Sequence, residues 1–404
     1  MTIPTTETVS WSNKAATRTV VVAPSLNIET TASISAKLFE ELVKNTDGFL
    51  IVPGQKHTVK ELTIYDAPMG GKAADVVTLI TGYSQTIPLG HRVSEGIAAG
   101  SSANIANTIR ELGVQDIGII GAIGKGGGGD ALVTSLERRG FRDLLLVRRT
   151  GGSAQSLFLR APTGETIAFA KKPPYEVSPE ILAYLTTHAS PRVLICSGFL
   201  EYELNLINAL CDAEHVPEAR VLSPHVNCFD TETGRRSCLE LAKKADLFHL
   251  NQFEFARLLR LGGNDWAIPE DKHELITIMK KVEAKLVCVT CGDKGSVIYD
   301  SQQNDILRQS AFPVDTICNT TGAGDVHLAV LTYYLWLRGH RIKLAPALEL
   351  ATRICAKKIA FEGEAPRPWD GIPPSAERKP WVREAADHYH SGATPPDGYT
   401  PVSK

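Results

Sequence analysis

The chain has 404 residues, and 43% of them are hydrophobic, which is enough to bury a substantial core in one large domain or two small ones. Its 43 Lys and Arg nearly balance its 45 Asp and Glu, and the formal charge of −2 argues against the broad basic field of a nucleic-acid-binding protein. No apolar run approaches a membrane span, and the polar residues 1–16 lack the apolar stretch of a signal peptide. We therefore expect a soluble, cytoplasmic protein that binds neither nucleic acid nor membrane.

Strand and helix patterns alternate along most of the chain. Continuous apolar runs suit strands that are covered on both faces, and amphipathic stretches with helical spacing lie between them. This alternation predicts a layered α/β fold around a largely parallel sheet. The expected strands lie at residues 19–22, 118–120, 193–196, 247–250 and 286–289, and the expected helices at 103–112, 131–139, 203–213, 273–283 and 345–361.

Three regions depart from this alternation. Residues 46–95 hold Pro and Gly punctuation and a mixed strand-like run, which predicts an inserted lid subdomain. Residues 1–17 form a polar N-terminal tail, and residues 366–404 form a Pro-rich tail that is expected to wrap the surface or stay mobile. The main domain is therefore expected to span residues 18–365.

The eight cysteines show no framework spacing. Cys288 and Cys291 form a C-x-x-C pair, which could indicate redox or metal chemistry. However, Cys288 lies in a run that reads as a buried strand, and no second Cys or His pair lies nearby in the sequence. We therefore interpret both cysteines as packing residues.

The most informative segment is Asn-Thr-Thr-Gly-Ala-Gly-Asp at residues 319–325, which a long apolar helical stretch follows directly. Gly322 and Gly324 let the backbone turn tightly and approach a ligand closely. The N–H groups at a helix start form an anion site, and Asp325 beside it could take the proton of an attacking hydroxyl during phosphoryl transfer. The same residues also suit an ordinary helix N-cap, and this segment alone leaves both interpretations open.

This segment resembles the D-T-x-G-A-G-D signature of the ribokinase-like (PfkB) carbohydrate and nucleoside kinases. The resemblance implies a three-layer α/β/α domain with a mostly parallel central sheet and a small lid, and transfer of the γ-phosphoryl group of ATP with Mg²⁺. In that family the final Asp, here Asp325, is the catalytic base, and the turn before it, here Gly322, Ala323 and Gly324, forms the anion hole for the phosphate.

The first residue of the signature differs in this chain. Asn319 replaces an aspartate that often helps to hold a monovalent cation beside the anion hole. An Asn carbonyl can still serve, so Asn319 and Thr321 are the candidate ligands for K⁺, and we expect activation by potassium to be weak. His327 stands where the family often has an aromatic residue, and we interpret it as packing.

Four further segments match the family in its order. The first two imply contacts to substrate hydroxyls, and the amide and carboxylate side chains can each hold such groups. Glu29 replaces the family's Asp, and Ala99 replaces one of its glycines. The residues implied in substrate binding are Asn27 and Glu29, in a match to G-S-x-N-x-D, and Gly100 and Asn104, in a match to G-G-x-x-x-N-x-A.

The other two segments imply nucleotide and metal binding. Asn251 and Glu254 match N-x-x-E, which organises Mg²⁺ and phosphate mostly through water, as a cation that keeps several waters prefers. Thr290, Gly292 and Gly295 match T-x-G-x-x-G, which with Asn251 lines the nucleotide. Taken alone, these segments also read as a helix start and a strand–turn–strand.

The alternatives differ in class. No G-x-G-x-x-G opens a helix after the first strand and no G-x-x-x-x-G-K-[ST] occurs, which argues against a dehydrogenase and a P-loop enzyme. A non-catalytic binding protein on this scaffold would keep the fold and lose the base. Among kinases, the long insertion at 46–95 resembles that of adenosine and inosine-guanosine kinases, which favours a ribonucleoside as the small-molecule substrate over a simple sugar. Such lids also mediate dimer contacts, so a homodimer through the lid is a further expectation.

Overall fold

The computed structural model describes residues 9–10, 18–44, 56–58, 61–69, 72–80, 84–88, 91–125, 127–149, 152–162, 166–172, 191–213, 218–262, 266–317, 320–338 and 343–360. A ten-stranded sheet runs through the main part of this structure, in the order β1-β10-β9-β2-β13-β14-β15-β16-β17-β18. The strands from β10 to β16 are parallel, whereas β1 at one edge and β17 and β18 at the other pair antiparallel with their neighbours. The predicted, largely parallel central sheet is therefore confirmed.

The strands of this sheet cover the five runs that the sequence predicts and add others. Their bounds are β1 (Val9–Ser10), β2 (Arg18–Pro24), β9 (Ile117–Gly124), β10 (Asp143–Arg149), β13 (Pro191–Phe199), β14 (Ala219–Pro224), β15 (Leu247–Asn251), β16 (Leu286–Thr290), β17 (Ser296–Asp300) and β18 (Asp305–Gln309).

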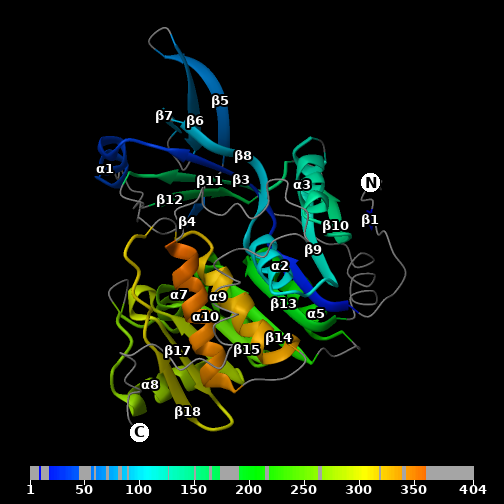
Figure 1. The fold of residues 1–404 in the computed structure, drawn as a ribbon, viewed down its shortest axis with the longest axis vertical. Helices are drawn as coiled ribbons and strands as arrows, with labels where there is room; N and C mark the ends of the chain where they lie inside the picture. The colour runs from blue at the N-terminus through cyan, green and yellow to red at the C-terminus, as the bar shows by residue number, and fades with distance from the viewer. Residues whose placement is uncertain are drawn as a thin grey trace.

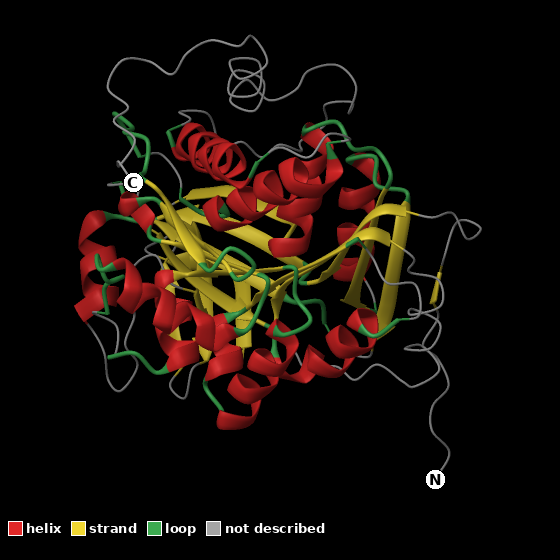
Figure 2. Ribbon diagram, turned by 90° about the horizontal axis from the view of Figure 1, so that it is seen from below, coloured by secondary structure: helices red, strands yellow, loops and turns green. Residues whose placement is uncertain are grey.

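Helices cover both faces of the sheet, as Figure 2 shows. Val20 and Val22 of β2 point into a core formed with α2, α3, α9 and α10, whereas Val21 and Ala23 point into a second core with α5, α6, α7 and α8. This alternation explains the continuous apolar run, because each face of the strand has its own core. The helices are α1 (Ala36–Lys44), α2 (Ser101–Glu111), α3 (Gly127–Arg138), α5 (Leu204–Cys211), α6 (Glu232–Ala242), α7 (Gln252–Leu259), α8 (Lys272–Met279), α9 (Ala323–Thr332), which continues as a π-helical turn over Tyr333–Leu337, and α10 (Leu344–Ile359).

The region predicted as a lid contributes strands to two smaller sheets. β5 (Glu61–Met69), β6 (Lys72–Ile80) and β7 (Ser84–Pro88) form an antiparallel sheet that projects from one end of the molecule (Figure 1). A five-stranded sheet has the order β4-β12-β11-β3-β8 and combines strands from inside and outside residues 46–95. Its members are β3 (Asn27–Ser33), β4 (Lys56–Thr58), β8 (His91–Ala99), β11 (Gln155–Arg160) and β12 (Thr166–Lys171).

Of the two predicted tails, only the N-terminal one can be compared with the structure, and only in part. Val9–Ser10, inside the predicted N-terminal tail, pairs with β10, so part of that tail belongs to the sheet edge. The predicted C-terminal tail, residues 366–404, lies outside the described residues. The limits of the main domain and the lid stay predictions.

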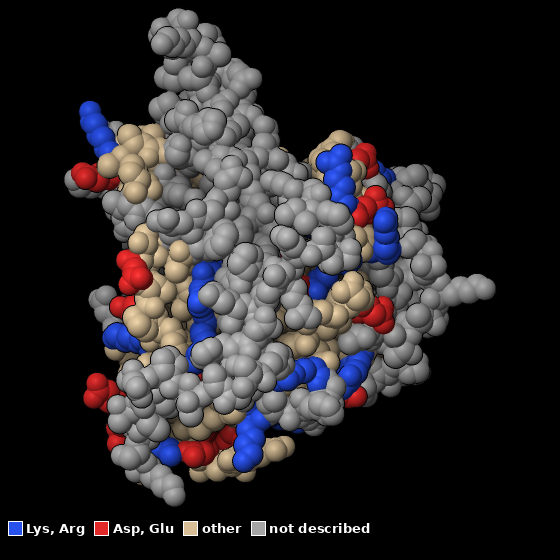
Figure 3. Space-filling view, in the orientation of Figure 1, with Lys and Arg blue, Asp and Glu red and all other residues tan. Residues whose placement is uncertain are grey.

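On the face in Figure 3, described Lys and Arg side chains lie interspersed with Asp and Glu side chains and form no single-sign field. Within the described part of the chain, no helix has the length and apolar content needed to cross a bilayer.

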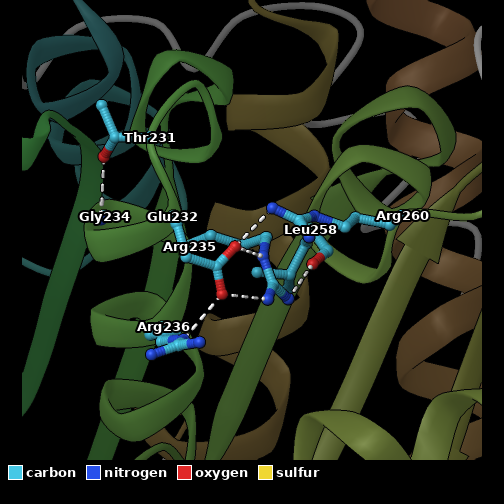
Figure 4. Close-up of polar contacts among 7 residues, drawn as sticks. All are labelled: Thr231, Glu232, Gly234, Arg235, Arg236, Leu258 and Arg260. Atoms are coloured by element: carbon cyan, nitrogen blue, oxygen red, sulfur yellow. Dashed lines mark hydrogen bonds and ion pairs between the residues drawn. The ribbon is translucent and has the colours of Figure 1, made fainter.

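An ion-pair cluster ties α6 to the end of α7 (Figure 4). Glu232, in the first turn of α6, accepts hydrogen bonds from Arg235 at 2.7 Å and Arg236 at 2.6 Å, and it also pairs with Arg260 at the end of α7. Arg235 in turn donates to the carbonyl of Leu258 at 3.2 Å. Because Asn251 caps the start of α7, this cluster holds the end of the helix that lies opposite the candidate metal-binding residues.

This cluster predicts an acid-sensitive contribution to stability. The hydrogen bond from Arg235, with those of its neighbours, lowers the pKa of Glu232 from 4.5 to about 2. A lowered folded-state pKa stabilises the fold above pH 4.5, and this contribution is lost as the pH falls towards 2. We expect Glu232→Gln to lower the urea midpoint at pH 7, with the difference shrinking below pH 4.5. Glu240→Gln, which removes one exposed pair with Lys243, should change the midpoint little at any pH.

Candidate active site

A polar cavity of about 330 Å³ lies at the carboxyl ends of the parallel strands β13 to β16, next to the N-termini of α2 and α9. Open α/β sheets place ligands at this edge, because the strand ends and helix N-termini converge there. The lining residues are Gly100, Ser101, Asn104, Phe158, Ser197, Gly198, Ser223, Pro224, His225, His249, Asn251, Glu254, Thr290 and residues 320–325.

The start of α9 forms one wall of the cavity. Gly322 caps this helix in the left-handed conformation, with φ 72°, which glycine adopts without the penalty of a Cβ. The N–H of Ala323 donates to the carbonyl of Thr320 at 3.1 Å, and Val326 donates to Gly322 at 3.0 Å. Within the described residues, the N–H of Gly324 donates to no backbone carbonyl, and a Cβ at Gly324 would meet no atom within 4 Å. The backbone N–H of Gly324 is thus an accessible donor at this turn.

Asp325 and Asn104 join the two helix starts. Asn104 Nδ2 donates to Asp325 Oδ2 at 2.7 Å, although the residues are 221 positions apart. Gly100 caps the start of α2 with φ 92° and with no side-chain hydrogen bond at the cap. The amide of Asn104 holds the carboxylate in one orientation at the cavity wall, because a charge-assisted hydrogen bond is stronger than a neutral one.

Asn251 and Glu254 form a capping box at the start of α7. The side chain of Asn251 accepts from the N–H of Glu254, and Glu254 Oε2 accepts from the N–H of Asn251, both at 2.8 Å. Both residues line the cavity. Removal from bulk water and then the charge of Asp325 raise the pKa of Glu254 to about 7, despite the opposing hydrogen bond from Asn251. Two carboxylates in one polar cavity are the oxygen-rich environment that a divalent cation prefers.

The segment implied in nucleotide binding, residues 290–295, reaches the cavity only in part. Thr290 lines it at the end of β16, whereas Gly292 and Gly295 are not among the lining residues. Gly295 has φ 91°, and a Cβ there would lie 2.0 Å from the carbonyl oxygen of Gln309. The close approach of β18 therefore requires this glycine for a structural reason, and a role in nucleotide binding stays a prediction.

Three predicted site residues cannot be assessed from these contacts. Asn27 and Glu29 lie in β3, which pairs with β8 near Gly100, but their side chains are outside the described part of the structure. Asn319 lies outside the described residues altogether, whereas Thr321 lines the cavity.

Comparison with known proteins identifies the family. Residues 73–359, most of the chain, match the profile of the pfkB family of carbohydrate kinases. The chain belongs to the PfkB family. A 248-residue stretch is 23% identical to the bifunctional protein HldE of Hydrogenovibrio crunogenus, which is 61% of this chain and 48% of that protein. The chain spans less than half the length of the curated relatives that it matches.

Solved structures show that this PfkB chain has the ribokinase-like α/β/α fold. The ribokinase from Giardia lamblia aligns with a TM-score of 0.62 and 14% identity, over 94% of this chain and all (100%) of its own. The adenosine kinase from Sinorhizobium meliloti aligns with a TM-score of 0.59 and 17% identity, over 92% of this chain and 99% of its own. At these identities the likeness concerns the fold alone.

Part of the cavity in this PfkB chain is lined by residues that belong to none of the family motifs. Ser197 and Gly198 close β13, and Ser223, Pro224 and His225 follow or end β14. Neither segment matches a motif quoted above. The signal that could have found them is their position directly after apolar strand runs, because parallel strands bring their carboxyl ends to one edge.

Behind the cavity, His249 of β15 meets His327 of α9. His249 Nε2 lies 3.2 Å from His327 Nδ1, so one ring donates and the other accepts. Burial lowers the pKa of both rings, that of His327 to about 4, which keeps both neutral. The Sγ of Cys288 and a nitrogen of each ring lie within 4.8 Å of one another. His327 is buried as predicted for a packing residue, but it also has a polar partner that the sequence did not reveal.

Proposed function

We propose that this chain is an ATP-dependent kinase that transfers the γ-phosphoryl group to a primary hydroxyl of a small molecule, with Asp325 as the general base. The observation that carries this proposal is the joint presence, in one polar cavity, of the Asp325 carboxylate and the open backbone of Gly324. A carboxylate beside an anion-binding helix start is the arrangement that phosphoryl transfer to an alcohol needs.

The residues divide the work as follows. Gly324 donates its N–H to an oxygen of the transferring phosphate, and the positive end of α9 stabilises the charge that develops there. Asn104 orients Asp325 through the 2.7 Å hydrogen bond, and its own carbonyl oxygen offers an acceptor for a substrate hydroxyl. Asp325 accepts the proton of the attacking hydroxyl. A non-catalytic binding protein would not require this oriented carboxylate.

Glu254 and Asn251 fit the magnesium that the family implies, because Glu254 is a partly exposed carboxylate on the wall of a cavity that Asp325 also lines. When bound, Mg²⁺ neutralises charge on the nucleotide phosphates. Glu254 would hold the hydration shell of the Mg²⁺ ion. Thr290 also lines the cavity, where it would contact the nucleotide. The family resemblance also supports a role in nucleotide binding for Gly292 and Gly295. It supports a role in substrate binding for Asn27 and Glu29.

The magnesium requirement should depend on pH. The pKa of Glu254 is raised to about 7, so the carboxylate is protonated below that pH and loses the charge that attracts a cation. We expect the Mg²⁺ concentration for half-maximal rate to rise as the pH falls from 8 to 6. Glu254→Gln should need more Mg²⁺ at every pH and should lose this pH dependence. A pH dependence that persists unchanged in Glu254→Gln would assign it to another group.

The substrate we propose is a ribonucleoside, phosphorylated at its 5′-hydroxyl. The support is the long insertion at 46–95, whose three-stranded part projects as Figure 1 shows and offers chain to cover a base. The similar alignments to a ribokinase and an adenosine kinase do not separate a sugar from a nucleoside. A sugar such as ribose or fructose is therefore the second candidate. A homodimer through the lid also stays a prediction.

A screen that measures ATP consumption and product mass tests both the proposed kinase activity and the proposed substrate. We expect purified protein with Mg-ATP to form a nucleoside monophosphate faster than any sugar phosphate, and Asp325→Asn to form neither at a comparable rate. Turnover of ribose or fructose with none of any nucleoside would replace the proposed substrate and keep the kinase. ATP binding without phosphoryl transfer to any member of either panel would support the non-catalytic alternative instead.

A further inference from the structure

Helix α10 places a buried ammonium group against the phosphate-binding turn. Lys358, in the last turn of α10, has only 6% of its surface exposed. Its Nζ donates a hydrogen bond to the main-chain carbonyl of Thr321, one residue before the glycine that caps α9. Lysine is almost never buried unless its charge is matched by polar partners, because desolvation of the ammonium is costly. A buried lysine at this position therefore points to a role for its charge.

A second contact holds α10 to the same turn. Cys355, three residues earlier on α10, donates its Sγ–H to the carbonyl of Ala323 at 3.2 Å. Burial raises the pKa of Cys355 to about 11, so it remains a neutral thiol donor. Helices α9 and α10 lie side by side in Figure 1, and residues of both pack in the same core. The carbonyls of Thr321 and Ala323 thus point towards α10, which leaves the N–H of Gly324 on the side of the cavity.

Thr321 is also a residue that the family resemblance assigns to K⁺, and its main-chain carbonyl is an oxygen that such a cation could use. A potassium ion bound to that oxygen would lie within a few ångströms of the Lys358 ammonium and would compete with it for the same lone pairs. Like charges at such separations repel strongly away from bulk water. Within the part of the chain that the structure describes, the Lys358 ammonium at the Thr321 carbonyl therefore disfavours a monovalent cation bound to that oxygen.

We propose that the Lys358 ammonium takes the place of a monovalent cation behind the phosphate-binding turn, so that this enzyme works without K⁺. Lys358 acts as a positioning residue: it fixes the Thr321 carbonyl and supplies a permanent positive charge on the far side of the turn from the transferring phosphate. A fixed charge there is present throughout the reaction and needs no ion to bind first. This inference rests on the proposed kinase activity.

Cation dependence of turnover tests the proposal. In a buffer with only tetramethylammonium as the monovalent cation, we expect wild-type kcat to change less than about twofold when K⁺ is added. Lys358→Ala should lower kcat by about 10–100-fold, the usual size for a residue that supports a site from behind. Added K⁺ or NH₄⁺ should restore much of that loss, because the vacated space can then hold a cation. Lys357→Ala, which removes an exposed charge one residue away on α10, should behave as wild type.

A readout independent of turnover separates this inference from the proposed function. In thermal-shift measurements, K⁺ should stabilise Lys358→Ala and leave the wild type unchanged, whether or not an acceptor is known. The absence of phosphoryl transfer by the wild type would count against the kinase proposal and leave the thermal result standing. Strong K⁺ activation of the wild type would overturn the inference. A second result would also overturn the inference. If Lys358→Ala folds but neither K⁺ nor NH₄⁺ restores its activity or its thermal stability, Lys358 serves packing only.

Discussion

Replacing Asp325 with asparagine is expected to lower kcat by about 10²–10⁴-fold, the range that removal of a general base usually produces. Asparagine has nearly the same shape and can still accept the hydrogen bond from Asn104, so the start of α9 should keep its conformation. What it cannot do is take the proton of the attacking hydroxyl. The KM for ATP should change little, because the role proposed for Asp325 is towards the acceptor hydroxyl.

Asp271→Asn is a matched control for this experiment. Asp271 is also an acid at a helix start, where it accepts the N–H of Glu274 at 2.7 Å, but it caps α8 and does not line the cavity. Asparagine caps a helix as well as aspartate does, so this variant should keep wild-type kcat. An unchanged kcat in Asp325→Asn itself would remove that residue from the mechanism.

Replacing Gly324 with valine should abolish measurable turnover while the protein stays folded. Among the described residues, and apart from its chain neighbours and the backbone of its own helix, a Cβ at Gly324 would meet no atom within 4 Å. Valine is also better tolerated in a helix than glycine, so we expect the variant to fold. The added methyl groups would instead occupy the space in front of the open N–H, where the phosphate must approach. We expect the loss in kcat to reach at least about 10²-fold, the effect of removing one preorganised donor.

Two further variants make this result specific. Gly127→Val also places valine in the first turn of a helix, with no atom near the new Cβ, but it lies on α3 away from the cavity and should be active. Gly322→Ala should destabilise the fold instead, because φ is 72° and the Cβ would lie 3.2 Å from Asn104 Nδ2. Near-normal turnover by a folded Gly324→Val would mean that this glycine serves the turn and not the phosphate.

The two carboxylates of the cavity have different environments, and this difference supports different roles. Asn104 donates directly to Asp325 and so holds this carboxylate in one orientation. Glu254 is held by a backbone N–H, and its pKa is raised to about 7 by burial and by the charge of Asp325. A bound cation would reverse that rise, because it favours the ionised carboxylate. This difference supports the proposal that Asp325 acts as the base and that Glu254 organises the metal.

Features that depend on neighbouring residues could be predicted from the sequence alone. Residues 319–325 before a long apolar stretch predicted a helix start with an accessible backbone, and α9 begins at Ala323 with Gly322 in the left-handed conformation. Asn251 and Glu254, three residues apart, predicted a helix start and form a capping box. The continuous apolar runs predicted strands covered on both faces, as the two cores confirm. In each case the preference lies in local backbone geometry or in strand and helix periodicity, which a short stretch of sequence encodes.

The contacts that complete the site depended on the tertiary structure. The packing of α2 against α9 brings Asn104 to Asp325. The order of the strands adds Ser223 and His225, which match no motif, to the cavity wall. The packing of α10 on α9 brings Lys358 to Thr321, where the sequence had predicted a potassium ligand. The pairing of His249 with His327 likewise joins residues 78 positions apart. Such contacts depend on how distant elements pack, and the local preferences that place each residue in a helix or strand carry no information about which neighbour it will meet.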